Sequence, residues 1–312
     1  MAQIQVFVGI DVSKDRLDIH VRPGGEFFSL SNDAAGFRSL LGRSDLAGAV
    51  IGCEATGGYE DALLVALSEA GRPGYCLHPA DIRAFARLQG RRGKTDRLDA
   101  RTIADALPHV LETRKPLVRT EKDSKLRELL TVRRALLTAQ IEIRSHLSRM
   151  RCRESLSVLN QMHDLHKRRI AELERAIAKL TCDDPRGIRL RTAPGVGPQL
   201  AAGILAFLPE IGTLSSRRIA SLVGVAPHPR QSGETTRPGR CQAGRAIVRR
   251  TLYMATLSVI KTGKGVIHGF YKRLRENGKP FKVAMVAAMR KLIVTLNAMI
   301  REEADWTPDM QS

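Results

Sequence analysis

Four acidic residues stand where a metal-dependent active site could be built. Asp11 ends the first apolar strand expected in the chain and Glu54 ends a second, while Asp96 and Asp99 lie three residues apart at the start of an expected helix. Parallel strands bring their carboxyl ends to one sheet edge, and residues i and i+3 of a helix share a face. Clustered carboxylates need cations, and an all-oxygen ligand set suits Mg²⁺ or Mn²⁺. We therefore expect the four acids to bind such ions and to catalyse phosphodiester displacement.

A simpler interpretation of each acid stays open at this point. Carboxylates in the first turn of a helix commonly complement its dipole, and an acid at the end of a strand often forms a turn. Further acids of the same segments are expected to be solvated or capping residues: Asp15, Asp18, Glu60, Asp61 and Asp105. The catalytic interpretation is favoured by the basic residues that surround the helical pair.

The chain is strongly basic, with 51 Lys and Arg against 32 Asp and Glu and a formal net charge of +19. Such an excess favours a polyanionic partner, DNA or RNA, over the alternative of a merely solvated basic face. The candidate phosphate-binding residues form two groups, one beside the helical acids and one in a polar, basic loop expected over residues 227–245. These are Arg91, Arg92, Lys94 and Arg97 in the first group, and Arg230, Arg237, Arg240 and Arg245 in the second.

Ser232 lies inside the second basic group and is followed by Gly233, which leaves room for close approach. From the residues alone, an ordinary loop hydroxyl is the commoner role, and a nucleophile is the alternative. No His and Asp spacing of an acyl-transfer triad accompanies it. A PGVG turn over residues 194–197 either holds a DNA phosphate through its backbone N–H groups or simply links two helices.

The amino-terminal part of the chain predicts alternating strands and helices over residues 1–113. Short β-branched and aromatic runs over 4–11, 16–21 and 26–31 predict an antiparallel meander. The continuous apolar run over 47–54 predicts a strand buried on both faces, parallel to the first strand. This pattern places the ends of the two acid-bearing strands side by side.

The rest of the chain predicts helices. No Gly or Pro occurs between Pro116 and Pro185, and heptad spacing of apolar residues predicts a two-helix antiparallel arm or an interrupted coiled coil over 114–186, with a less regular middle at 153–157. Residues 187–312 predict a mainly helical unit. The fold class expected is therefore α/β plus α.

Composition also narrows the location and chemistry of the chain. No uncharged apolar run approaches the roughly 18 residues of a membrane span, and the amino terminus has no secretion signal, so we expect a cytoplasmic protein without membrane attachment. Five scattered cysteines without a C-x-x-C pair predict free thiols instead of disulfides or a structural zinc site.

Several motifs resemble those of a known family. GIDVSKDRLDIHV with Asp11, CEATGGYE with Glu54, and KTDRLDARTIAD with Asp96 and Asp99 resemble the D-E-D-D motif of insertion-sequence transposases whose catalytic domain is similar to the RuvC Holliday-junction resolvase. APGVG, LVGVAPHPRQSGETT and GRAIVRRTLYMA are similar to the carboxy-terminal transposase domain of the same family. The resemblance covers nearly the whole chain in the right order.

The resemblance implies a RuvC-like RNase H-fold domain with a mixed sheet, a coiled-coil arm that forms a dimer to tetramer, and a transposase domain. It implies Mg²⁺ or Mn²⁺ at the four acids and recombination through a circular intermediate, related to Piv-type DNA invertases, in the cytoplasm and nucleoid of a bacterium. It also implies a structured non-coding RNA that bridges donor and target DNA.

The resemblance further implies that Ser232 attacks a DNA phosphate and forms a phosphoserine, completed by the metal site of another protomer. Cys241 and Gln242 stand where the family more usually has Ser and Lys, so a lysine contact to phosphate is not expected there. Two alternatives remain at this point: a RuvC-like structure-specific nuclease that uses water, and a non-catalytic nucleic-acid-binding regulator.

Overall fold

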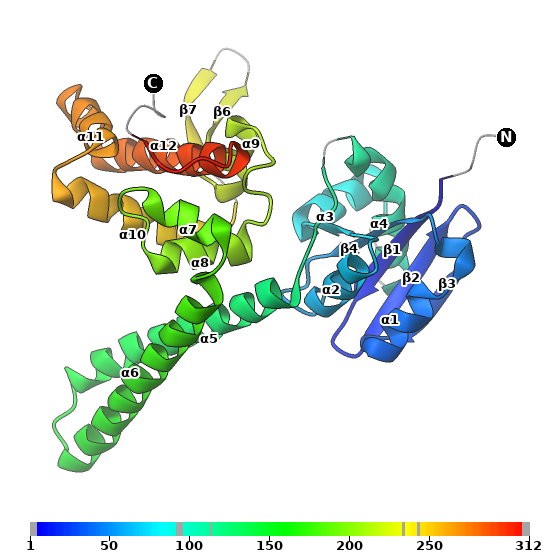
Figure 1. The fold of residues 1–312 in the computed structure, drawn as a ribbon, viewed down its shortest axis with the longest axis horizontal. Helices are drawn as coiled ribbons and strands as arrows, with labels where there is room; N and C mark the ends of the chain where they lie inside the picture. The colour runs from blue at the N-terminus through cyan, green and yellow to red at the C-terminus, as the bar shows by residue number, and fades with distance from the viewer. Residues whose placement is uncertain (1–4, 92–95, 113, 233–234, 242–243, 308–312) are drawn as a thin grey trace. The chain divides into compact units, whose positions relative to one another are not determined.

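A computed structural model describes residues 5–91, 96–112, 114–232, 235–241 and 244–307 of the chain. The chain divides into two compact units, Met1–Ser124 and Lys125–Ser312. Each unit has a hydrophobic core of its own and is described separately, with its elements labelled as in Figure 1.

Unit 1 is built on a mixed sheet of five strands in the order β3-β2-β1-β4-β5. The meander and the parallel pairing of the two acid-bearing strands are confirmed, because β1 pairs antiparallel with β2 and parallel with β4. The strands are β1 (Phe7–Val12), β2 (Arg16–Arg22), β3 (Phe27–Ser31), β4 (Val50–Glu54) and β5 (Tyr75–Leu77).

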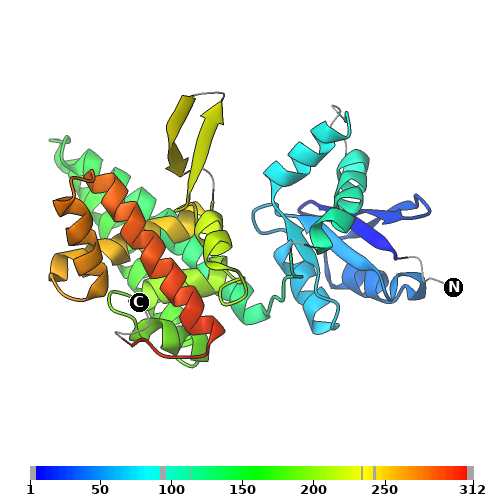
Figure 2. The ribbon, with the colours of Figure 1, turned by 90° about the horizontal axis from the view of Figure 1, so that it is seen from above.

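Helices cover both faces of this sheet, which Figure 2 shows between two helical layers. Alternate β1 residues Val8, Ile10 and Val12 are buried in one core cluster with α1 and α2 side chains. Phe7, on the opposite face of β1, packs with α3 and α4 side chains in a second cluster. The helices are α1 (Ala34–Leu41), α2 (Asp61–Glu69), α3 (Pro79–Leu88) and α4 (Asp96–Leu111), with a short 3₁₀ helix at Ser44–Leu46.

Two long helices, α5 (Glu121–Leu147) and α6 (Arg153–Thr181), form the expected arm. The irregular middle predicted at 153–157 is wrong: those residues begin α6, and the chain reverses at 148–152. Leu126 and Ile143 of α5 and Ile170 and Ile177 of α6, which follow the heptad spacing, are buried, and the coiled coil itself stays a prediction. Apolar side chains outside that spacing, Val132, Ile141 and Val158, are 50%, 69% and 56% exposed. Arg133 of α5 donates to Glu174 of α6 at 2.9 and 2.5 Å, so an ion pair joins the two helices.

The remainder of unit 2 is mainly helical, as predicted. Its core buries nearly all of α8, together with one side of α12, which is long and apolar enough for a membrane span but has 61% of that apolar window buried inside the protein. The helices are α7 (Pro185–Thr192), α8 (Pro198–Phe207), α9 (Ser216–Val223), α10 (Ala246–Thr262), α11 (Val266–Glu276) and α12 (Phe281–Arg301).

The polar loop predicted over residues 227–245 is wrong for most of its length. Pro227–Ser232 forms β6 and Thr235–Cys241 forms β7, and the two strands pair antiparallel as a hairpin. Proline and charged residues have a low propensity for strands. Antiparallel pairing between β6 and β7 offsets that low propensity.

Candidate active site

Helix α4 packs directly on the backbone of β1. A Cβ atom at Gly9 would lie 2.2 Å from the carbonyl oxygen of Ala100 and 2.3 Å from the backbone nitrogen of Ala104. Only glycine permits so close an approach of helix and strand. Gly9 therefore fixes α4 against the sheet two residues before Asp11.

A second glycine plays the same part in β4. A Cβ atom at Gly52 would lie 2.5 Å from the Cδ2 atom of Leu107 in α4. Gly52 is registered with Gly9 across the β1–β4 pair, and it precedes Glu54 by two residues. Side chains two apart in a strand share a face, so Asp11 and Glu54 belong to the face that α4 covers. The glycine two residues before Asp11 and before Glu54 is thus a sequence signal of close helix packing beside these two acids.

The direction of α4 brings its first turn toward the strand ends that carry the acids. Asp105, late in α4, lies 3.6 Å from Arg22, which is registered with Phe7 at the start of β1. Val110 packs in the same cluster as Phe7 and Val50. The carboxyl end of α4 thus lies over the strand starts, and the helix runs antiparallel to β1 and β4.

The distances from the Gly9 contact to Asp11 along the strand and to Asp96 along the helix are nearly equal. Asp11 lies about 6.6 Å beyond Gly9 at a strand rise of about 3.3 Å per residue. Asp96 lies about 6 Å before Ala100 at a helix rise of about 1.5 Å per residue. Asp99 lies one helical turn before Ile103, so both residues are on the same side of α4. The backbone therefore carries all four acid positions toward the same end of the α4–sheet interface.

The donor set fits a hard divalent cation, because carboxylate oxygens are the ligands that Mg²⁺ and Mn²⁺ prefer. Among the side chains that the structure describes, no group of three or more His, Cys, Asp or Glu is close enough to hold a metal ion. The side chain of Asp96 lies outside that description. The other three acids, Asp11, Glu54 and Asp99, are described, and each takes part in polar interactions.

Three of the five further acids that the sequence predicted to be solvated or capping, Asp18, Glu60 and Asp61, are buried instead of solvated. Asp18 and Asp61 are 4% and 9% exposed, and Glu60 is fully buried. Asp18 accepts from Ser29 at 2.5 Å and pairs with Arg16 at 2.9 Å. These carboxylates are buried because hydrogen-bond donors or cations face them, which sequence spacing does not reveal.

Arg91, a predicted phosphate-binding residue, is paired with side chains of unit 1. Its guanidinium donates to Asp105 at 2.6 Å and to Thr102 at 3.2 Å, with only 20% of the side chain exposed. This pairing ties the end of the α3 segment to α4 and leaves Arg91 little capacity for a phosphate. Arg92 and Lys94 lie outside the described residues, as does the side chain of Arg97.

The predicted nucleophile belongs to unit 2. Ser232 is the last residue of β6 and is registered with Thr235 of β7. Its side chain, and those of Arg230, Arg237 and Arg240, lie outside the description. Ser232 thus stands on a two-stranded hairpin, whereas Asp11 and Glu54 stand on a five-stranded sheet and Asp96 and Asp99 begin α4.

Arg245, the last candidate of the second basic group, lies between β7 and α10 and is the N-cap residue of α10. It donates to both carboxylate oxygens of Glu210 at 2.5 Å and to the carbonyl oxygen of Phe207 at 2.8 Å. A bidentate pair of this kind orients the start of α10. Cys241 ends β7; burial raises the pKa of its thiol, against the opposing charges of Arg249 and Arg290. Gln242 lies outside the described residues.

Comparison with known proteins identifies both halves of this arrangement. A DEDD model of IS110 elements, described as a transposase, matches residues 8–152, which include all four acids. A model described as the transposase IS116/IS110/IS902 family matches residues 188–272, which include Ser232. The chain carries both domains of the IS110/IS116 transposases. It is therefore a DNA recombinase, and its five-stranded mixed sheet is consistent with the RNase H-like fold of a DEDD domain, a domain that generally works with divalent metal.

Curated relatives cover the chain at low identity. The IS110/IS116 transposase described here is 25% identical over 322 residues to the pilin gene-inverting protein of Moraxella bovis, which spans 96% of each chain. It is 27% identical over 266 residues to the protein of the same name in Moraxella lacunata, with 80% and 79% covered. A 44.8 kDa protein of insertion element IS116 from Streptomyces clavuligerus is 30% identical over 145 residues, 45% of this chain and 35% of that protein.

Proposed function

We propose that this transposase recombines insertion-sequence DNA with a divalent-metal site at Asp11, Glu54, Asp96 and Asp99 and with Ser232 as its nucleophile. The observation that carries the proposal is the packing of α4 on Gly9 and Gly52, each two residues before an acid. When bound, Mg²⁺ would polarise the phosphodiester and neutralise charge that develops on it. The four carboxylates would hold that ion and would orient the phosphate.

In the proposed reaction the Ser232 oxygen bonds to the phosphorus while the bond from phosphorus to one sugar oxygen breaks. The serine hydroxyl gives up a proton, the leaving sugar oxygen takes one up, and the phosphoserine keeps the energy of the broken bond for rejoining. No cofactor is consumed. The hairpin supports this role, since a strand pair outside the helical core is suited to reach DNA held elsewhere.

The test is to trap the intermediate. The transposase is incubated with Mg²⁺, the RNA transcribed beside its gene, and labelled DNA that carries the ends of the element. The wild type should give a protein-DNA adduct, and Ser232→Ala should give none while still binding the DNA. An adduct that persists in Ser232→Ala contradicts the serine assignment.

The same experiment separates the two alternatives. Free nicks without an adduct would indicate a nuclease that uses water. Recombination that is unchanged in Asp11→Asn and Asp96→Asn would indicate that the acids are structural. In the proposed mechanism both substitutions abolish adduct formation, because each removes a metal ligand.

We also propose that a structured RNA guides the reaction by bridging donor and target DNA. The support is the net charge of +19, which favours polyanionic partners, and the similarity to the family. RNA that co-purifies with the transposase should contain loops complementary to both DNA targets. Purified protein that recombines equally well after ribonuclease treatment contradicts this proposal.

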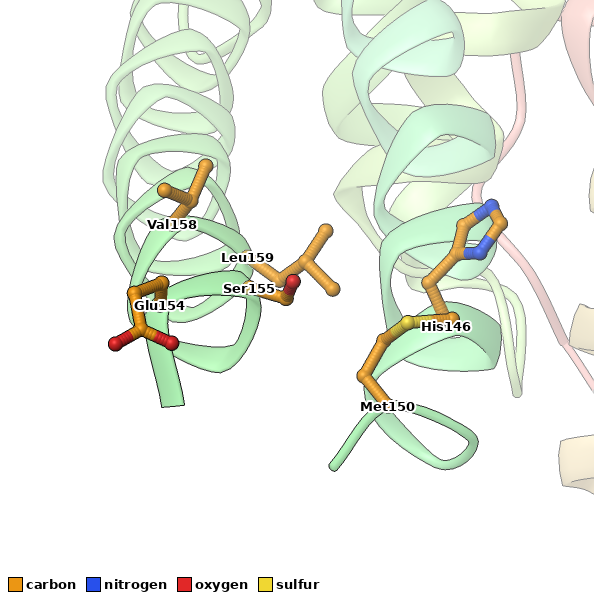
Figure 3. A pocket seen from close by; sticks show the side chains of 6 residues that line it. All are labelled: His146, Met150, Glu154, Ser155, Val158 and Leu159. Carbon is orange, nitrogen blue, oxygen red and sulfur yellow. The ribbon is translucent and has the colours of Figure 1, made fainter. Parts of the chain in front are cut away.

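The arm is the proposed site of oligomerisation. Besides its exposed apolar side chains, it ends in an open pocket of about 560 Å³ with a mostly apolar lining (Figure 3). The lining residues are His146, Met150, Glu154, Ser155, Val158 and Leu159. Val158→Glu should lower the molecular mass in sedimentation, and Ser157→Glu, at the neighbouring exposed position, should not. Equal mass in both variants contradicts an interface at the arm tip.

A further inference from the structure

The backbone ladder between the two acid-bearing strands stops one residue short of the acids. The registered pairs of β1 and β4 run from Phe7 with Val50 to Ile10 with Cys53. On their outer sides the acids are held, since Asp11 is registered with Asp18 of β2 and Glu54 with Leu77 of β5. The sheet therefore does not by itself set the separation between Asp11 and Glu54, and this separation decides whether both reach one ion.

The segment that follows Glu54 has little stiffness of its own. Residues 55–60 read ATGGYE, and Gly57 and Gly58 have φ values of +89° and +136°, a region that side chains with a Cβ rarely adopt. Nothing lies within 4 Å of a Cβ built at either glycine, so packing does not hold them. Hydrogen bonds must therefore hold the path of this loop.

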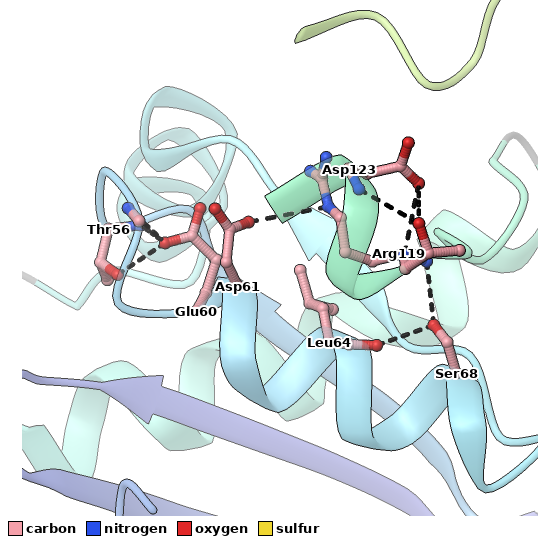
Figure 4. A network of polar contacts seen from close by, with 9 residues as sticks. Thr56, Glu60, Asp61, Leu64, Ser68, Arg119 and Asp123 are labelled. Atoms are coloured by element: carbon pink, nitrogen blue, oxygen red, sulfur yellow. Dashed lines mark hydrogen bonds and ion pairs between the residues drawn. The ribbon is translucent and has the colours of Figure 1, made fainter. Parts of the chain in front are cut away.

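Glu60 supplies several of these bonds from the far end of the loop. One oxygen of its buried carboxylate accepts from the Thr56 N–H at 3.1 Å, the Thr56 hydroxyl at 2.9 Å and the Gly58 N–H at 2.8 Å (Figure 4). Hydrogen bonds to a charged acceptor are roughly twice as strong as neutral ones. Glu60 thus folds the loop back onto itself directly behind Glu54.

The helix that carries Glu60 is itself fixed. The next residue, Asp61, lies 3.7 Å from the guanidinium of Arg119, and the side chains are only 13% and 5% exposed. The Arg119 N–H donates to the Ser68 hydroxyl at 3.0 Å, one more tie between this segment and α2 (Figure 4). Glu60 therefore lies at the start of a helix that Arg119 contacts at two points.

Asn32 joins this loop to the other acid-bearing strand. Its side-chain amide donates to the carbonyl oxygen of Ser13 at 2.8 Å and to that of Tyr59 at 3.1 Å. Its backbone N–H donates to the carbonyl oxygen of Asp15 at 3.0 Å. Ser13 lies two residues after Asp11, and Tyr59 lies in the loop after Glu54. One amide group thus spans the gap that the β1–β4 ladder leaves open.

We propose that Asn32 and Glu60 are positioning residues that set the separation of the Asp11 and Glu54 carboxylates and so the affinity of the site for a divalent ion. The inference rests on the proposed metal site and adds to it the residues that shape it. Neither residue is a ligand in this account. Both act through the backbone of the segments that follow the acids.

Metal affinity, read without activity, tests the proposal. Binding of Mn²⁺ to the full chain is followed by the electron paramagnetic resonance signal of the free ion. Asn32→Ala, and Asn32→Asp, which keeps the shape but loses the donors, should weaken binding by about 10-fold or more, the usual effect of losing a residue that orients a ligand. Ser31→Ala is the matched control: it loses a hydrogen bond to Asp33 of 2.8 Å but touches neither acid-bearing segment.

Glu60 is tested by a graded pair of substitutions. Glu60→Gln keeps one accepting oxygen and should weaken Mn²⁺ binding less than Glu60→Ala does. Amide hydrogen exchange over residues 55–60 should rise in the same order, which provides a readout that does not depend on the metal. Thermal melting shows whether each variant is folded.

The outcomes distinguish this inference from the function on which it rests. If Asn32→Ala and Asn32→Asp fold and bind Mn²⁺ within about twofold of the wild type while Asp11→Asn does not bind, the positioning role is wrong and the metal site stands. If Asp11→Asn binds as the wild type does, the metal site is wrong and the positioning role falls with it. Unchanged hydrogen exchange over residues 55–60 in Glu60→Ala overturns the role of Glu60.

Discussion

The two halves of the proposed catalytic machinery rest on very different supports. Asp11 and Glu54 lie at the ends of strands in a sheet that is covered on both faces, and Asp96 and Asp99 begin α4, which packs on Gly9. Glu60 holds the loop that follows Glu54. Ser232 ends a strand that pairs with one other strand alone in the described sheets. Metal ligands need fixed separations, whereas a nucleophile must reach a substrate phosphate. In the proposed mechanism the metal site would therefore be preformed and the serine would be delivered to it.

Gly9→Val should have the largest effect, because it should disrupt the support of the metal site in unit 1. A side chain there meets α4 backbone atoms at 2.2 and 2.3 Å, so the helix must move and unit 1 should lose about 3 kcal/mol or more of stability. Recombination and Mn²⁺ binding should both disappear. Gly48→Ala is the control, since nothing lies within 4 Å of its added atom. Normal Mn²⁺ binding by a folded Gly9→Val protein contradicts the seating of α4.

Salt should have the next largest effect, and it should act on nucleic-acid binding alone. If six or more phosphates are contacted, affinity for DNA should fall by about 10³-fold between about 50 and 200 mM salt. Filter binding or fluorescence anisotropy measures it. A flat response would show that the basic residues are only solvated. Stability of unit 1 should change little over the same range.

Two arginines of the hairpin region should separate structural from phosphate-binding roles. Arg245→Ala removes a bidentate pair with Glu210 that is about one-third exposed, so after solvent screening it should cost about 1–2 kcal/mol in thermal unfolding. Arg237→Ala should leave unfolding unchanged and lower the salt dependence of binding by about one phosphate. Equal effects of the two variants on stability contradict this division.

The smallest expected effect is a difference in alkylation rate between cysteines, and its measurement does not depend on activity. A hydrogen bond with Cys76 and burial raise the pKa of Cys53, so little of its thiolate exists near pH 8, and alkylation should be slow. Cys152 and Cys182 are exposed and should react quickly. Mass spectrometry of peptides measures each rate. Fast labelling of Cys53 would show that the sheet beside Glu54 opens readily.

Sequence patterns predicted the strands of unit 1 well. Apolar, β-branched runs with turn residues between them predict β1 to β4 to within three residues at each end, because burial on a sheet needs that composition. The hairpin was missed, since Pro227, Pro229 and Pro238 lower strand propensity and only pairing between the strands compensates. The position predicted for the break of the arm, 153–157, is about five residues too late, because the residues of the true break, 148–152, include no Gly or Pro.

The acids could be predicted from sequence, but the residues that position them could not. Strand ends and helical spacing point to Asp11, Glu54 and the helical pair without any tertiary information. Asn32 and Glu60 act through carbonyl and N–H groups of other segments, and such partners become visible only in the folded chain. Arg91 and Arg245 show the reverse case: residues that look available for DNA are engaged within the protein.

Mixing two inactive variants tests the division of labour most directly. Asp11→Asn keeps the serine and Ser232→Ala keeps the acids, so an oligomer with one protomer of each contains one intact composite centre if the serine acts on the metal site of another protomer. Mixed oligomers should regain adduct formation with labelled element ends, with the adduct on the Asp11→Asn chain. A mixture as inactive as each variant alone, under conditions in which the wild type reacts, would contradict this division of labour.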